Sequence, residues 1–241
     1  MIGRFDEFGL AKSAVARATA ISGVFHDYYF RVEAEGREHV PATGSAILVA
    51  NHGGMLPIDA AMLWADVARA HRTLRPIADH FVAALPFVGT WFARAGMVTG
   101  TKANVRVLIE RGELLAIWPE GTSGPAKPFR ERYAIQRWTV GFAELALRFR
   151  VPVIPVGIVG SEECWPILAK LPIRAFGSPY LPIPAVPLPL PVRFHVRYGT
   201  PLELLGDPDD PRAIARAAES TQIQVENLLA DLRRERKGWW R

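Results

Sequence analysis

The chain has 241 residues, and 49% of them are hydrophobic, which is enough for one large core and favours a single domain. Its net charge of +5 comes from scattered basic residues, so we expect no nucleic acid partner. An anionic partner fits better, such as a phosphate head group, a nucleotide-bearing cofactor or an acidic membrane surface. The single cysteine, Cys164, excludes an internal disulfide and a multi-cysteine metal site, so we expect a cytoplasmic protein without a bound metal.

Helical and strand patterns alternate along the first half of the chain. Apolar side chains recur at helical spacing over residues 10–28, which predicts an amphipathic helix that either caps the core or lies on a membrane. Residues 28–35 alternate as an edge strand does. The elements predicted next are a buried strand at 46–50, a helix at 59–70, a strand at 74–78, a helical region broken near Pro86 at 81–94 and a helix at 103–111.

The second half continues the alternation. It predicts a strand at 114–118, a helix at 133–149, a strand at 151–159, a proline-rich extended loop at 175–192, a strand at 192–198 and a terminal helix at 210–236. This order favours a single α/β domain whose mostly parallel or mixed sheet is flanked by helices. We divide the chain into an N-terminal amphipathic helix and edge strand (1–35), a core (36–205) and a C-terminal helix packed on the core (206–241).

Two short segments follow predicted buried strands, at the place where parallel sheets gather functional groups. In the first, His52 precedes two glycines that permit unusual loop geometry, and Asp59 is close enough in sequence to orient it. A neutral imidazole held in one tautomer by a carboxylate can take a proton from an alcohol that attacks a thioester. The competing interpretation is a histidine that only satisfies a backbone group in a turn.

The second segment is Trp118-Pro119-Glu120-Gly121-Thr122. Its backbone amides and its carboxylate can meet a polar substrate, although the composition is also typical of a surface turn. Basic residues flank it, and two that converge are enough to hold a phosphate. These residues are Arg94, Lys102, Lys127, Arg130 and Arg132.

Four ordered segments between Val49 and Val156 resemble those of the lysophosphatidate and glycerol-3-phosphate acyltransferases of the PlsC-like type. Six residues separate histidine from aspartate here, where the family usually has four, and Ser123 stands where it usually has arginine. The segments are Asn51-His52 with Asp59, Gly89-Thr90-Trp91-Phe92-Ala93-Arg94, Trp118-Pro119-Glu120-Gly121-Thr122, and Val151-Pro152-Val153-Ile154-Pro155-Val156.

The resemblance implies an O-acyltransferase with the glycerolipid acyltransferase fold. The enzyme would move a fatty acyl group from acyl-CoA or acyl-carrier protein to a lysophospholipid hydroxyl, with 1-acylglycerol-3-phosphate as the first-choice acceptor and no cofactor. His52 would be the general base and Asp59 would orient it. The substrate-binding residues that we expect are Asn51, Arg94, Glu120, Gly121, Thr122 and Lys127.

Three alternatives stay open at this stage. Relatives with the longer histidine–aspartate spacing are similar to enzymes that act on neutral glycerides, which makes a mono- or diacylglycerol a second possible acceptor. A serine hydrolase needs a nucleophile on a strained strand-to-helix turn; Ser123 is the nearest candidate, but Pro125 stands where that turn needs its last glycine. A non-catalytic, membrane-associated lipid-binding protein is the third alternative.

A glycerolipid substrate lies in a bilayer, so we expect peripheral association with a membrane. The uncharged residues 175–192 are long enough to suggest a spanning helix, but their prolines would break it repeatedly. The segments that we expect to dock are the N-terminal amphipathic helix, residues Phe176–Leu190 and Trp239-Trp240-Arg241, whose indoles suit a membrane interface.

Overall fold

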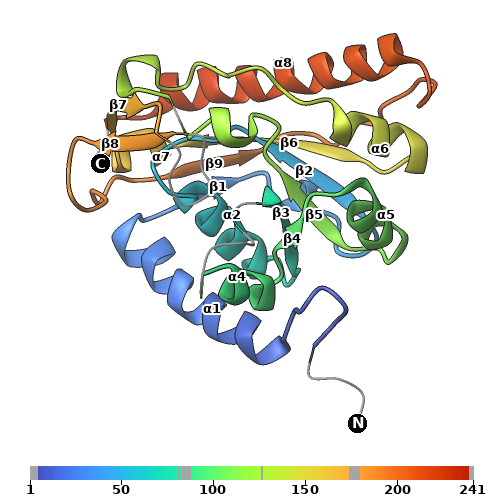
Figure 1. Cartoon of the computed structure of the whole chain (residues 1–241), viewed down its shortest axis with the longest axis horizontal. Coiled ribbons are helices and arrows are strands. Elements are labelled where there is room, and N and C mark those ends of the chain that lie inside the picture. Colours follow the sequence, from blue (N-terminus) through green and yellow to red (C-terminus); the bar gives the residue numbers. More distant parts are fainter. Residues whose placement is uncertain (1–4, 81, 83–87, 126, 174–179, 239–241) are drawn as a thin grey trace.

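The computed structural model describes residues 5–80, 82, 88–125, 127–173 and 180–238. Within this part of the chain, a seven-stranded sheet forms the centre of the molecule, with helices on both faces (Figure 1). The strand order is β1-β9-β6-β2-β5-β3-β4. The strands are β1 (Glu33–Glu35), β2 (Ala46–Ala50), β3 (Leu74–Ala78), β4 (Val98–Thr99), β5 (Leu114–Ile117), β6 (Val153–Val159) and β9 (His195–Tyr198).

The sheet is mixed but mostly parallel, as the sequence predicts. Strands β6, β2, β5, β3 and β4 run parallel to one another, whereas β9 is antiparallel to β6 and β1 is parallel to β9. β2 lies between β5 and β6, and all five of its residues are buried. A strand covered on both faces needs such a continuous apolar sequence.

Side chains of β2 alternate between two hydrophobic clusters, one on each face of the sheet. Ile47 and Val49 pack with residues of α5, α6 and α8, whereas Leu48 and Ala50 pack with residues of α2. Figure 1 shows the corresponding two layers of helices. The first layer contains α5 (Lys102–Glu110), α6 (Gly141–Phe149) and α8 (Pro211–Glu235), and the second contains α1 (Lys12–Val24), α2 (Ile58–Arg69) and α4 (Val88–Ala95).

The N-terminal helix α1 packs against the other helices of the second layer. It contacts α2 and α4, and the small side chains of Ala14 and Ala18 are buried at this contact. The chain then continues as a π-helix, η1 (Phe25–Tyr29), so the strand predicted at 28–35 is shorter and begins only at Glu33. Within the described ranges, no helix combines the length and the apolar character that a membrane span requires.

Short elements complete the described chain. They are the 3-10 turns η2 (Arg37–His39), η3 (Gly121–Ser123) and η4 (Phe129–Glu131), the helix α7 (Ser161–Cys164), and the strands β7 (Ile167–Leu171) and β8 (Leu181–Pro184). β7 and β8 form a separate two-stranded antiparallel sheet. The proline-rich stretch therefore contributes a paired strand instead of a simple loop; prolines fit this small sheet because each of its strands has a free edge.

The helix predicted at 133–149 begins only at Gly141. Residues before it are held by contacts with other segments: the amide of Tyr133 donates to Glu162, that of Gln136 to Glu120, and that of Thr139 to the Pro119 carbonyl. Tyr133 also has a φ of 65°, in the left-handed region, which no helix interior accepts. The spacing of apolar residues predicts a longer helix because it contains no information about these polar contacts.

Candidate active site

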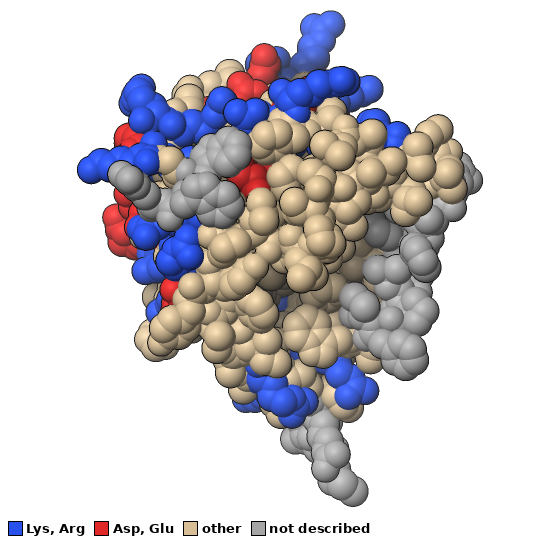
Figure 2. All heavy atoms as spheres, turned by 90° about the vertical axis from the view of Figure 1, so that its left-hand side faces the viewer, with Lys and Arg blue, Asp and Glu red and all other residues tan. Residues whose placement is uncertain are grey.

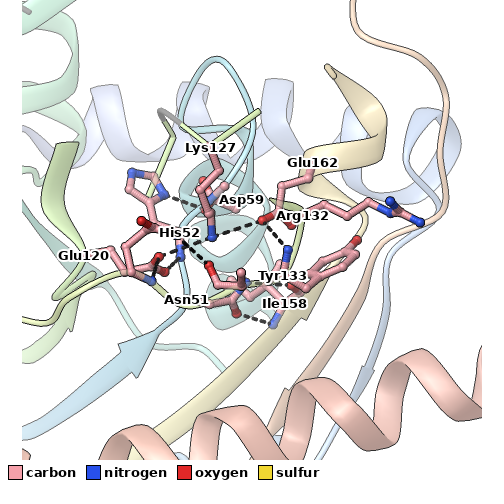
Figure 3. A network of polar contacts seen from close by, with 12 residues as sticks. Asn51, His52, Asp59, Glu120, Lys127, Arg132, Tyr133, Ile158 and Glu162 are labelled. Carbon is pink, nitrogen blue, oxygen red and sulfur yellow. Dashed lines mark hydrogen bonds and ion pairs between the residues drawn. The ribbon is translucent and has the colours of Figure 1, made fainter. Parts of the chain in front are cut away.

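Three neighbouring strands bring polar residues to one place. β5, β2 and β6 lie side by side and run parallel, so their carboxyl ends meet at one edge of the sheet. Glu120 follows β5, His52 follows β2, and Glu162 lies in α7, just after β6. Figure 3 shows these three residues converging with Asp59 and Lys127 in one polar network.

His52 and Asp59 form a close pair. The distance between His52 Nδ1 and Asp59 Oδ2 is 2.6 Å, the Asp59 carboxylate is fully buried, and 15% of the His52 side chain is exposed. The same carboxylate accepts hydrogen bonds from the amides of Gly53 at 3.1 Å and Ala60 at 2.8 Å, which fix its orientation. With Nδ1 donating to Asp59, the Nε2 atom of the imidazole is the one able to accept a proton.

The loop between the two residues accommodates the long spacing. Gly54 has a φ of +85°, and a side chain there would place its Cβ atom 2.7 Å from the Ser161 carbonyl oxygen. Only glycine fits this turn against α7. Because α2 begins at Ile58, Asp59 is its second residue and faces back toward His52. Six intervening residues therefore still place the carboxylate within hydrogen-bonding distance of the imidazole.

Glu120 supports the backbone of His52. Its Oε1 atom accepts the His52 amide at 2.9 Å, and its Oε2 atom accepts the Gln136 amide at 2.8 Å and pairs with Lys127 Nζ at 3.2 Å. The side chain is fully buried. Both carboxylate oxygens are thus engaged by protein groups, and the residue holds the ends of β2 and β5 together.

Lys127 lies buried between two carboxylates. Its Nζ atom is 3.2 Å from Glu120 and 3.1 Å from Glu162 Oε1. Burial alone would lower the pKa of Lys127, but the charges of Glu162 and Glu120 raise it above its ordinary value. Burial raises the pKa of Glu162 to about 7, although the charge of Lys127 acts in the opposite direction. Lys127 is therefore a charged internal bridge between two buried carboxylates.

Asn51 joins β2 to β6. Its amide nitrogen donates to the Ile158 carbonyl at 2.9 Å, and its side-chain oxygen accepts from the Ile158 amide at 2.8 Å. The residue is 1% exposed. These two bonds continue the strand pairing by one step at the point where the chain turns into the His52 loop.

Gly121 and Thr122 lie at the surface of the site, in η3. Gly121 is exposed with a φ of +53°, and Thr122 is half-buried, with its carbonyl accepting a hydrogen bond from the Tyr180 hydroxyl at 2.7 Å. Ser123 is also exposed. Because a 3-10 turn and not an α-helix follows β5, Ser123 lacks the strand-to-helix turn that presents a hydrolase nucleophile.

Arg94 makes its described contacts elsewhere. It lies in the last turn of α4, is exposed, and places its guanidinium carbon 5.0 Å from the centre of the Phe5 ring. Its carbonyl accepts the Ala11 amide. Among the described contacts, none connects it to the His52 network.

The sequence interpretation did not include Glu162, Glu163 or Tyr133. Two adjacent acids directly after a buried strand were an available signal, because acidic side chains are rarely buried without partners. Tyr133 donates its hydroxyl to Glu163, and Arg236, just after α8, pairs with the same carboxylate at 2.7 Å. Among the described residues, no cluster of three or more histidine, cysteine or acidic side chains has the geometry of a metal site.

Comparisons with known proteins identify the family of this chain. A family model described as Acyltransferase covers residues 31–159. An uncharacterized protein of Mycobacterium tuberculosis is 37% identical over an alignment of 245 positions. The alignment spans 93% of this chain and 68% of the relative. The "DGAT1/2-independent enzyme synthesizing storage lipids" of Bos taurus is 28% identical over 230 residues, which span 92% of this chain and 64% of that enzyme.

A solved structure shows the same fold. The crystal structure of the 1-acyl-sn-glycerophosphate acyltransferase PlsC from Thermotoga maritima matches with a TM-score of 0.62 at 17% identity, covering 94% of this chain and 81% of that chain. The layered α/β fold is therefore PlsC-like, and a histidine paired with an aspartate follows its strand β2. The chain belongs to the Acyltransferase family, whose model matches more than half of it.

Proposed function

We propose that this protein transfers a fatty acyl group from an acyl thioester, acyl-CoA or acyl-carrier protein, to the hydroxyl of a glycerolipid. The observation that carries the proposal is the pair of His52 and Asp59, 2.6 Å apart at the end of β2, in a chain of the Acyltransferase family. The names of the bovine relative and of the Thermotoga structure both describe lipid chemistry, which supports a lipid substrate.

In the proposed reaction His52 acts as a general base that Asp59 orients and that is regenerated at the end of each turnover. His52 Nε2 takes the proton of the acceptor hydroxyl while the hydroxyl oxygen attacks the thioester carbonyl. The new carbon–oxygen bond forms, the carbon–sulfur bond breaks, and the imidazolium returns the proton to the departing thiolate. Asp59 stabilises the imidazolium between these steps. The acceptor is itself the nucleophile, so no acyl-enzyme is needed.

Within this proposal, the expected substrate-binding residues divide into two groups. Asn51, Glu120 and Lys127 are buried and bonded to protein groups, so they position the loop that carries His52. Gly121 and Thr122 lie at the surface of the same site and keep the role of contacting the acceptor. Arg94 would need to leave the Phe5 ring to contribute.

We propose a mono- or diacylglycerol, ahead of 1-acylglycerol-3-phosphate, as the acceptor. Binding a phosphate takes converging cationic groups. Lys127 is engaged by two buried carboxylates, Lys102 pairs with Glu144 at 2.6 Å, and Arg130 pairs with Glu131 at 3.2 Å. Ser123 also replaces the arginine typical of the resembling family. A neutral acceptor requires none of these cations.

An acceptor panel tests the proposal. Purified protein is given long-chain acyl-CoA with monoacylglycerol, diacylglycerol, lysophosphatidate or lysophosphatidylcholine, and products are identified by mass spectrometry. We expect acylation of a neutral glyceride, with His52→Ala lowering kcat by about 10²–10⁴-fold because the general base is lost. His71→Ala, which alters a histidine outside the network, is the control. Full activity of His52→Ala contradicts the mechanism, and exclusive acylation of lysophosphatidate contradicts the neutral acceptor.

We also propose that the protein docks on an anionic bilayer through β7 and β8. Figure 2 shows that the side at the left of Figure 1 is largely free of charged side chains and is hollowed near its centre, with basic side chains gathered above and below. β7 and β8 lie on this side (Figure 1). Exposed apolar side chains lie in these two strands and just beyond the end of each, and we call them together the hairpin face: Leu168, Leu171, Ile173, Leu181 and Leu188. An apolar surface with basic margins suits a negatively charged membrane.

The structure describes only part of the segments that we expect to dock. Trp239-Trp240-Arg241 and the first residues of Phe176–Leu190 lie outside the described residues. The C-terminal end of α1 and the start of η1 expose Ile21, Val24 and Phe25. Of the proposed docking elements, the hairpin face therefore has the most exposed apolar side chains in the described part of the chain.

Vesicle flotation tests the docking surface. We expect the wild-type protein to float with phosphatidylglycerol vesicles, and Leu168→Asp/Leu188→Asp to float at least about tenfold less, because two exposed leucines no longer enter the bilayer. Leu205→Asp is the matched control, because Leu205 is also an exposed leucine, with 87% of it exposed. It lies near Leu202, which pairs with Val153 at the start of β6, whereas β7 follows the other end of that strand. Equal flotation of all three proteins contradicts this surface.

A further inference from the structure

The loop that carries His52 is closed into a ring by a buried charge bridge. Glu120 accepts the His52 amide, Lys127 joins Glu120 to Glu162, and Glu162 packs against the residue after His52. The three charged side chains are 0%, 2% and 4% exposed, in the order Glu120, Lys127 and Glu162. Figure 3 shows this chain of contacts running from the His52 backbone to α7.

Direct packing of Glu162 on Gly53 closes the ring. A Cβ atom added at Gly53 would lie 2.5 Å from Glu162 Cδ, so the carboxyl group lies directly against the Gly53 backbone. The amide of Gly53 donates to the same Asp59 oxygen that pairs with His52. Movement of Glu162 would therefore displace the peptide that connects the base to its orienting carboxylate.

We propose that Glu162 is a positioning residue for His52, acting through Lys127 and Glu120 and through its contact with Gly53. This inference rests on the proposed acyl transfer, because it assigns His52 the role of base. Glu162 itself is buried behind Gly53 and acts only through other residues. Its contribution is to keep Nε2 of His52 in the position from which a proton can be taken, where a displacement of about 1 Å costs about 100-fold in rate.

The charge of Glu162 decides whether the bridge is complete. The groups that face it are Lys127, the Tyr133 amide, Glu163 on its own helix, and, across Gly53, Asp59. Its Oε2 atom has no hydrogen-bond partner among the described residues, which leaves its charge only partly compensated. Burial raises the pKa of this carboxyl to about 7, so it loses its proton in the neutral range.

The ionisation of Glu162 then enters the acid side of the pH–rate profile. Because Glu162 must be ionised to hold Lys127, the wild-type kcat should fall as the pH drops through the pKa of Glu162, which is about 7.

Glu162→Gln tests the proposal because it keeps the shape of the side chain and removes its ionisation. We expect kcat to fall by about 10- to 100-fold with little change in KM, and the decrease of kcat that follows the protonation of Glu162 to disappear from the pH profile. Glu163→Gln is the matched control, since Glu163 is equally buried on the same helix but pairs with Arg236 and Tyr133. It should keep the wild-type pH profile.

A readout without turnover separates this proposal from the proposed function. The NMR signal of the His52 ring, identified by its absence in His52→Ala, should respond to the ionisation of Glu162 near pH 7 in the wild type, and this response should be absent in Glu162→Gln. This holds even for a protein that acylates none of the acceptors, and the wild-type signal serves if Glu162→Gln fails to fold. A wild-type signal that does not change near pH 7, or the same loss of response in Glu163→Gln, overturns the proposal.

Discussion

Two buried aspartates of α2 show how similar contacts can serve different purposes. Asp59 and Asp66 are both fully buried, and each accepts from a histidine ring: Asp59 from His52 at 2.6 Å and Asp66 from His26 at 3.0 Å. His52 lies in a loop after β2 and keeps 15% of its side chain exposed, whereas 3% of the His26 side chain is exposed. Only the first pair therefore offers an imidazole that a substrate can reach.

At the residue scale, Asp59→Asn is expected to abolish most activity while leaving the fold intact. The amide cannot stabilise the imidazolium and permits the other tautomer, so we expect kcat to fall by about 10³–10⁴-fold. Asp66→Asn is the matched control and should retain activity in its folded fraction. The measurement is kcat for both variants, with folding checked by circular dichroism. Wild-type kcat in Asp59→Asn would exclude the orienting role.

At the scale of elements, the sequence predicted the central strands well because burial on both faces leaves an unambiguous apolar run. The strand predicted at 46–50 corresponds to β2, and the proximity of His52 to Asp59 follows from the order of strand, loop and helix. A pattern of this kind depends on neighbouring residues, so it can be recognised without tertiary contacts.

The remaining parts of the site depend on contacts between distant segments. Glu162 lies 42 positions beyond Glu120, and Lys127 joins them only because β5 and β6 flank β2. Tyr133 leaves the helical pattern for the same reason, since its amide bonds to Glu162. No local periodicity encodes a bridge of three buried charges, so neither the bridge nor the late start of α6 could be predicted.

At the scale of the whole molecule, Asp66 connects the beginning of the chain to the sheet. It accepts from His26 of η1 at 3.0 Å, from Arg37 Nε at 2.9 Å and from the Tyr198 hydroxyl of β9 at 2.7 Å. The most distant of these groups in sequence, the Tyr198 hydroxyl, lies 132 positions from Asp66. One carboxylate of α2 therefore links η1, Arg37 and β9.

The protonation of Asp66 should be visible in the stability of the whole protein. Burial alone would raise the pKa of Asp66, but the hydrogen bonds from His26, Arg37 and Tyr198 lower it to about 2. A carboxyl with a lowered pKa in the folded state stabilises it above the unfolded pKa of about 3.8, here by about 2 kcal/mol. This contribution decreases as the pH falls toward 2, and about half of it is lost at pH 3.

Asp66→Asn should therefore lower the free energy of unfolding by about 2 kcal/mol at pH 7, and the difference from the wild type should narrow as the pH is lowered to 3. Urea denaturation followed by circular dichroism at both pH values measures it. Asp231→Asn is the control, because Asp231 is partly exposed and pairs with Arg234 on the same helix, so its effect should stay below about 0.5 kcal/mol at either pH. A difference for Asp66→Asn that is the same at pH 7 and pH 3 would mean that lost packing, and not the charge of Asp66, destabilises the variant.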